Sequence, residues 1–235
     1  MTIQKHILSK KDLQRAKVLQ GFFKTGPGEY GEGDVFLGLT VPQCREIAKK
    51  YRDLPMKDLQ ALLKSEIHEE RSIALMILVV RFEKADVKEQ EKIYKFYLKN
   101  TKYINNWDLV DSSAEYIVGA FLADKDRKIL DKLAKSKSLW ERRIAMLATF
   151  HFIKNKESKD ALRIAKILIT DKHDLIHKAS GWMLREIGKR ASEKDLKIFL
   201  DKNADKMPRT MLRYAIERMT PKERRHYMDM KLNKN

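Results

Sequence analysis

The sequence repeats at intervals of 35 or 36 residues, and this period restricts the fold more than any other feature. One column of residues recurs at spacings of 36, 35, 35 and 35: Arg71, Trp107, Arg142, His177 and Leu212. A second column, three positions later, holds mostly small residues: Ala74, Val110, Ala145, Ser180 and Ala215. Small residues at this spacing indicate where one helix presses against the next. A period of this length fits a helix pair with its turns, and such pairs bury their apolar sides by stacking.

The composition predicts an all-α chain. Only nine Gly and five Pro occur in 235 residues, good helix formers are common, and no segment alternates as a strand would. We expect helices over residues 10–23, 42–52, 55–64, 67–83, 86–99, 104–122, 125–136, 138–154, 157–169, 172–190, 193–203, 207–219 and 221–230. Thr40, Ser138, Asp171 and Ser192 stand where N-caps are wanted. The pattern resembles the HEAT-like or armadillo-type α-solenoid, as one domain over residues 1–235 with a frayed tail from Lys231.

The charge of the chain indicates a polyanionic partner. Fifty Lys and Arg against 33 acidic residues give a formal charge of +17, which favours nucleic acid first and an anionic membrane surface second. One position after the first column stand Ser72, Asp108, Arg143, Lys178 and Arg213. The last three place basic side chains in register, which predicts a basic concave face that holds DNA phosphates. The alternative is an ordinary solvated helix face.

The compartment follows from the cysteine count and the apolar runs. Cys44 is the only cysteine, so no internal disulfide can form and a reducing compartment fits. The N-terminus lacks the apolar run of a signal peptide, and the most apolar stretch, Ile73 to Val80, is too short to cross a membrane. We expect a cytoplasmic protein without membrane contact.

The Gly-rich loop 26–34 formally contains a GxGxxG pattern at Gly26, Gly28 and Gly31. We reject a dinucleotide site because no strand precedes the loop and its acidic residues would repel a pyrophosphate. A loop that folds over a neighbouring surface is expected instead, with Tyr30 as its exposed aromatic residue. Glu69 and Glu70, further on, are expected on a solvated helix surface.

Trp107 and Asp111 are four residues apart, which places an indole and a carboxylate on one helix face, in a chain rich in positive charge. Core packing and chemistry both explain such a pair. Trp182 has the same four-residue relation to Lys178, and Trp140 stands at a helix start. Gly181 costs roughly 1 kcal/mol in a helix interior, so it either relieves close packing or keeps a surface open.

Three segments resemble the signature segments of the AlkD-type alkylpurine DNA glycosylases. They are Asn-Trp-Asp-Leu-Val-Asp at 106–111, Leu-Trp-Glu-Arg-Arg-Ile-Ala at 139–145 and Lys-Ala-Ser-Gly-Trp-Met-Leu-Arg-Glu at 178–186. The stretch Phe-Leu-Gly at 36–38 is similar to that family's N-terminal element, so the resemblance spans nearly the whole chain. Asn106 stands where the best-known pattern carries a second Trp.

The resemblance implies a HEAT-like solenoid with a basic cradle for duplex DNA that contains alkylated purines. It implies that Trp107 and Trp182 flank the deoxyribose, that Asp111 is the catalytic carboxylate, that Arg143 holds a phosphate near the lesion, and that Tyr30 lies near the DNA. A purine alkylated at N3 or N7 is cationic and leaves readily, so Asp111 would stabilise the oxocarbenium-like sugar and position water. Base excision without strand cleavage is expected, because nothing singles out a nucleophilic lysine.

Two rival functions remain open: a non-catalytic solenoid that binds distorted or branched DNA, and a protein–protein scaffold. His173 and His177 are four residues apart, but no third ligand stands at a diagnostic spacing, so we expect no metal and no cofactor. We expect Cys44 to be a buried or incidental thiol and the protein to be a monomer.

Overall fold

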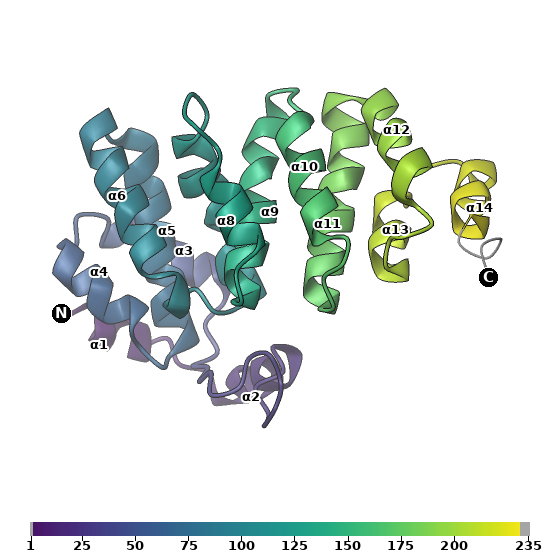
Figure 1. Cartoon of the computed structure of the whole chain (residues 1–235). Helices are drawn as coiled ribbons and strands as arrows, with labels where there is room; N and C mark the ends of the chain where they lie inside the picture. Colours follow the sequence, from purple (N-terminus) through teal and green to yellow (C-terminus); the bar gives the residue numbers. More distant parts are fainter. Residues whose placement is uncertain (1, 231–235) are drawn as a thin grey trace. The chain divides into compact units, whose positions relative to one another are not determined.

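The structure, a computed structural model, describes residues 2–230. All named secondary-structure elements in this range are helices or helical turns (Figure 1). The one extended pairing among these residues is an isolated bridge between Val35 and Ile67. The expected all-α class is therefore confirmed. The expected tail from Lys231 lies outside the described residues. The chain separates into two compact units, Met1–Ser113 and Ala114–Asn235, so its organisation as a single domain stays a prediction.

The N-terminal unit is built around α5 (His68–Lys84), which contacts α3, α4, α6 and α7. The other helices are α1 (Ile3–Leu8), α2 (Leu13–Phe22), α3 (Val41–Lys50), α4 (Met56–Leu63), α6 (Val87–Lys99) and α7 (Trp107–Asp111), with a 3₁₀ turn η1 (Thr101–Tyr103). The expected capping residue Thr40 forms a capping box with Gln43 at the start of α3.

The C-terminal unit stacks its helices in chain order (Figure 1). One row consists of the π-helical turn η2 (Glu115–Gly119), α9 (Leu139–Lys154), α11 (Asp174–Glu186) and α13 (Arg209–Ala215). The other consists of α8 (Ile129–Ala134), α10 (Lys159–Leu168) and α12 (Glu193–Asn203). A second π-helical turn, η3 (Ile187–Ala191), extends α11, and α14 (Pro221–Asp229) packs on α13. Stacked helix pairs, as the 35-residue period predicted, are confirmed.

Both columns of the repeat have a physical cause. Residues of the second column are at most 2% exposed, since this is where neighbouring helices meet. At three of the five positions of the first column, a side chain binds backbone carbonyl oxygens five or six residues earlier and so closes the loop before its helix. The pairs are Arg71 with Ser65 O (2.9 Å) and Glu66 O (3.2 Å), Arg142 with Ser136 O and Lys137 O (3.0 Å each), and His177 with Asp171 O (2.6 Å).

Gly181 lies where α11 packs against α13. A Cβ atom there would meet the backbone oxygen of Met211 and lie 2.5 Å from Tyr214 Cβ. Of the two explanations for this glycine, close helix packing is therefore the one the structure supports.

Several sequence expectations were wrong in detail. The expected helix 104–122 is interrupted at two places. At its start, Asn106 has an extended backbone and caps α7. After Asp111, the buried Ser113 hydroxyl donates to Leu109 O at 2.5 Å and competes with the helical hydrogen bonds of that turn. Helix α1 was missed. Asp171 does not cap α11; His173 takes that place. Helix α2 begins after its cap Asp12.

The apolar residues of α2 and its C-cap are divided between solvent and the core. Leu13, Val18 and Phe22 are more than half exposed, whereas Ala16 and Phe23 are buried. In the described part of the chain, no helix has the length and apolar character needed to cross a membrane.

Candidate active site

Helix α7 carries both members of the Trp107 and Asp111 pair and begins at an asparagine cap. Asn106 has extended backbone angles, and its side-chain oxygen accepts the Trp107 N–H at 2.8 Å. This cap satisfies a first-turn amide that the helix leaves unpaired. The five residues of α7 put Trp107 at its first position and Asp111 at its last, one turn apart.

Trp107 is half-buried, and its ring belongs to a stack of aromatic side chains. Its indole lies parallel to Phe23, with centroids 5.2 Å apart and planes 16° apart. Phe23 in turn stacks on Phe36 at 4.9 Å, and Phe36 on the His68 imidazole at 4.4 Å. The more exposed Phe22 meets the indole edge-on at 5.9 Å. The core-packing explanation therefore accounts for one face of Trp107.

Asp111 is half-buried at the end of α7. Its charge reaches the fully buried phenol of Tyr97, whose pKa is raised mainly by burial and further by Asp111, against the lowering effect of a hydrogen bond with Ser113. Tyr97 and Ser113 oxygens lie 2.9 Å apart. Asp111 is therefore close enough to this buried polar pair for its charge to affect the phenol.

A buried charge cluster adjoins the start of α7. The His68 ring places Nδ1 2.9 Å from Asp34 Oδ2 and Nε2 2.8 Å from Asp108 Oδ2. Asp34 also accepts hydrogen bonds from Arg71 and, at 3.1 Å, from the Asn106 amide. We call these five residues the His68 cluster. The sequence patterns include Arg71, Asn106 and Asp108 separately, but they do not indicate this group.

The cluster shifts the pKa values of its members. Burial would lower the pKa of His68, but hydrogen bonds to Asp108 and Asp34 and their charges outweigh it and raise this pKa from 6.5 to about 9. Burial would raise the pKa of Asp34, but the His68 hydrogen bond and the charges of Arg71 and His68 hold it below its ordinary value. His68 is therefore a buried cation near neutral pH.

The surface expectation for Glu69 and Glu70 was wrong, because their exposed fractions are only 3% and 8%. The Glu69 carboxylate accepts hydrogen bonds from the successive amides of residues 37–39, at 2.7 to 3.2 Å. Gly38 sits within this turn at φ +91°, where a side chain would be strained. Glu69 thus fixes the Phe-Leu-Gly stretch against α5.

The Gly-rich loop is closed by its own acidic side chains. Gly26 N–H donates to Glu29 and Gly28 N–H donates to Glu32, each at 3.0 Å. Amides that would cradle a phosphate are therefore already occupied. Tyr30, expected as the exposed aromatic residue of the loop, is only half-exposed. Asp34, at the end of the loop, is the residue that turns inward to His68.

The other proposed site residues belong to the C-terminal unit. Trp182 is half-buried on α11, with its ring 5.8 Å from Phe150. Trp140 is half-buried at the second position of α9.

The three basic residues in register differ in their exposure. Arg143 is 5% exposed and donates to Leu175 O at 2.6 Å. Lys178 is half-exposed and pairs with Asp174 at 2.7 Å, and Arg213 is exposed. The shared register therefore predicts equivalent positions on successive helices, but it does not predict which of these side chains are exposed to solvent.

The weaker candidate groups serve the fold. His173 caps α11 through Nδ1, which accepts the Leu175 N–H at 3.1 Å, and His177 binds Asp171 O. Cys44 is 3% exposed, and burial raises its pKa to about 12, so it is an inert thiol.

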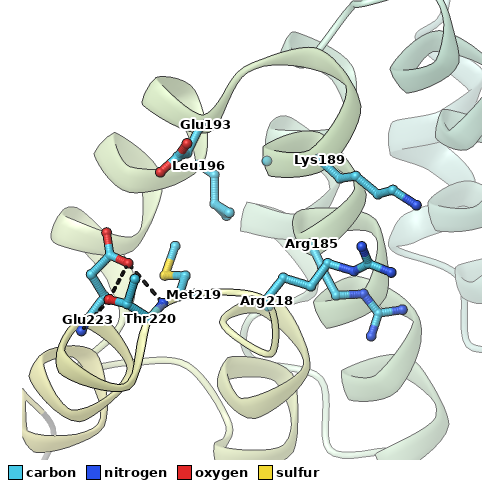
Figure 2. A pocket seen from close by; sticks show the side chains of 10 residues that line it. Arg185, Lys189, Glu193, Leu196, Arg218, Met219, Thr220 and Glu223 are labelled. Atoms are coloured by element: carbon cyan, nitrogen blue, oxygen red, sulfur yellow. Dashed lines mark hydrogen bonds between the residues drawn. The ribbon is translucent and has the colours of Figure 1, made fainter.

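A cavity of about 280 Å³ lies near the C-terminal end of the second unit. Figure 2 shows Arg185, Lys189 and Arg218 along one side of it and Glu193 and Glu223 along the other. Both glutamates pair with Lys197, at 2.7 and 2.8 Å. None of the catalytic or DNA-binding residues proposed from the sequence lines this cavity.

Residues 3–219 match the DNA alkylation repair enzyme family. The chain belongs to this family. A role for the chain in DNA repair follows from this membership. No similar sequence was found among the curated proteins.

Two solved structures of similar fold accompany the family match. A predicted DNA alkylation repair enzyme from Enterococcus faecalis has a TM-score of 0.69 at 16% identity, covering 90% of this chain and 98% of its own. AlkD2 from Streptococcus mutans has a TM-score of 0.50 at 18% identity, covering 93% of this chain and 96% of its own. At these identities the likeness shows the shared helical-repeat fold alone.

Proposed function

We propose that the chain is a DNA glycosylase that hydrolyses the N-glycosidic bond of purines alkylated at N3 or N7 in duplex DNA. The observation that carries this proposal is the pairing, on one five-residue helix of a DNA alkylation repair enzyme, of a half-buried indole with a half-buried carboxylate. Such a pair suits a reaction in which positive charge develops on a sugar.

The enzyme does not have to activate the alkylated purine as a leaving group. An alkylated purine already carries a positive charge, so it leaves without a strong general acid. Asp111 would stabilise the oxocarbenium-like sugar and orient the attacking water. Trp107, with one face stacked on Phe23, would offer the rest of its ring to the deoxyribose, and such aromatic contacts contribute about 0.5 to 2 kcal/mol. Trp182 is proposed as the second aromatic contact.

Contacts with the DNA backbone are proposed for Arg143, Lys178, Arg213 and Tyr30. Lys178 and Arg213 have the exposure that a phosphate contact needs, whereas Arg143 would have to leave the Leu175 carbonyl. Each phosphate contact that is lost should reduce the slope of log K against log salt by about 0.9. Lys178→Ala and Arg213→Ala should therefore weaken binding to all duplex sequences and flatten this slope.

The decisive experiment measures release of 7-methylguanine and 3-methyladenine from methylated duplex DNA by chromatography. Asp111→Asn should slow release by roughly 100-fold, the scale of losing one electrostatic contact to a transition state. Asp53→Asn is the matched control, because its side chain is 91% exposed and lies in the same unit. The control should keep the wild-type rate.

The outcomes separate the rival functions. Equal release by wild type and Asp111→Asn would refute the catalytic role of Asp111. Salt-dependent DNA binding by a wild type that releases no base would indicate a non-catalytic DNA-binding protein. Neither binding nor release would favour a protein–protein scaffold.

A further inference from the structure

The His68 cluster ties together three segments that are distant in the chain. Asp34 ends the Gly-rich loop, His68 and Arg71 lie in the first turn of α5, and Asn106 and Asp108 flank Trp107 at the start of α7. The exposed fractions of these residues, apart from Asp108, are 5% or less, and the Asp108 side chain is 26% exposed. The cluster is thus an interior structure that comes near solvent only at α7.

The hydrogen bonds favour a charged imidazole. Both ring nitrogens of His68 face carboxyl oxygens within 2.9 Å, and an ionised carboxylate only accepts, so with both carboxyls ionised both nitrogens carry hydrogen. The resulting imidazolium and Arg71 balance the charges of Asp34 and Asp108. The raised pKa of His68 agrees with this assignment.

The cluster fixes Trp107 from two directions. Asn106 and Asp108, its neighbours in the chain, are both anchored by hydrogen bonds to the cluster, which sets the first turn of α7. The His68 ring also supports the aromatic stack of Phe36 and Phe23 on which the indole lies. A displacement of the imidazole would therefore change the position of Trp107 in two ways, through the backbone of α7 and through the aromatic stack that contacts the indole ring.

Stability alone does not account for this arrangement. Buried ion pairs often contribute no more than a well-packed apolar core would, because desolvation offsets their attraction. Asp108 Oδ1 is also buried without a hydrogen-bond partner, which is a cost. What charged hydrogen bonds supply, and an apolar core does not, is a fixed direction for each partner.

We propose that His68 is a positioning residue that holds Trp107, and through α7 Asp111, in the orientation in which they act on the sugar. This inference rests on the proposed glycosylase function. It assigns a role to a histidine that does not itself touch substrate.

The test uses His68→Gln with His6→Gln as its matched control, because His6 is also buried in the N-terminal unit but lies outside the cluster. Trp107 is observed alone in chains that also carry Trp140→Phe and Trp182→Phe, by emission and acrylamide quenching. Release of 7-methylguanine in a single turnover and DNA affinity are measured in chains that keep all three tryptophans.

His68→Gln should move the Trp107 emission, increase its quenching and slow base release by roughly 100-fold, with DNA affinity changed less than about twofold, as expected from misplacing a catalytic group. His6→Gln should change none of these. Asp108→Asn keeps the size of the side chain and an acceptor for Nε2, so it should give a smaller change of the same kind even if His68→Gln does not fold.

Unchanged Trp107 emission and unchanged release in a folded His68→Gln or Asp108→Asn chain would overturn the inference. A loss of release through weaker DNA binding, with Trp107 unmoved, would overturn it as well. If the wild type releases no base while His68→Gln still moves Trp107, the proposed function fails and the positioning of Trp107 by His68 stands. The fluorescence and activity measurements therefore separate the two claims.

Discussion

Raising the pH from 6 to 10 should remove a stabilising charge from the interior of the N-terminal unit. The fold raises the pKa of His68 from 6.5 to about 9 and so favours its protonated form. The stabilisation is fully present below pH 6.5, declines between pH 6.5 and 9, and is lost above that. A difference of this size corresponds to about 3 kcal/mol of unfolding free energy, falling by about 1.4 kcal/mol per pH unit within the window.

The assay is urea unfolding of wild type and His68→Gln at half-unit steps of pH, followed by circular dichroism and by Trp107 fluorescence. The difference between the two chains isolates His68, because Cys44 and Tyr97, whose pKa values are raised by burial, titrate in both. The pKa of Asp34 is held below its ordinary value, so this carboxylate keeps its charge throughout the window. Asp108 and Arg71, the other charged members of the cluster, are present in both chains.

The expected result is a difference in unfolding free energy that shrinks by about 3 kcal/mol between pH 6 and 10. A difference that does not depend on pH would mean that His68 is neutral in the folded chain. One carboxyl of the cluster would then have to carry the proton, and the argument for a buried imidazolium would be refuted.

Three further predictions concern packing, loop closure and the thiol. Gly181→Ala should destabilise the chain by roughly 1 to 3 kcal/mol, because the added Cβ clashes with α13. Gly21→Ala should stabilise the chain slightly, because no atom lies within 4 Å of the added Cβ. Thermal unfolding measures both variants, and equal effects would contradict the packing argument. Arg142→Met should cost about 3 kcal/mol in urea unfolding, because the carboxylate of Asp171, 7% exposed, loses its cation; a neutral effect would show that the ion pair adds nothing. Cys44 should resist a disulfide reagent at pH 8 in the native chain and react once per chain in urea; rapid native labelling would contradict its burial.

The repeat was predictable because its causes are local and periodic. Stacked helices need small side chains at each crossing, and the column through Ala145 supplied them at a spacing that matches one helix pair. The first column gave the correct period, but the structural role of its side chains was not predicted. That Arg71 and Arg142 close the loops before their helices requires knowing where each helix begins.

The interruption near α7 was not predictable from periodicity. The apolar pattern of residues 104–122 continues through the break, and the break itself comes from side chains that compete for backbone groups, Asn106 at the start and Ser113 after the end. Residues of this type favour caps and turns, so a local rule could have placed a helix start at Trp107.

The His68 cluster could not be predicted, because its members are separated by 34 and 40 residues and meet only when the chain is folded. In the sequence, Glu69 and Glu70 resemble an exposed helix start rich in acidic residues, which is the usual arrangement. Their burial depends on the Phe-Leu-Gly stretch whose amides Glu69 accepts. The signal in the sequence was a histidine and an arginine three residues apart, with one aspartate at the end of the preceding Gly-rich loop and another in the segment that forms α7.

Asn106 shows how the departure from the expected family pattern and the buried cluster are connected. A second Trp at this position could neither accept the Trp107 N–H nor occupy the fully buried space that the amide fills 3.1 Å from Asp34. The asparagine does both, and so it joins the cap of α7 to the Gly-rich loop. In this chain the residue that looked like a missing aromatic contact is the one that couples Trp107 to a buried imidazolium, and the orientation of the proposed site therefore depends on polar contacts beneath it.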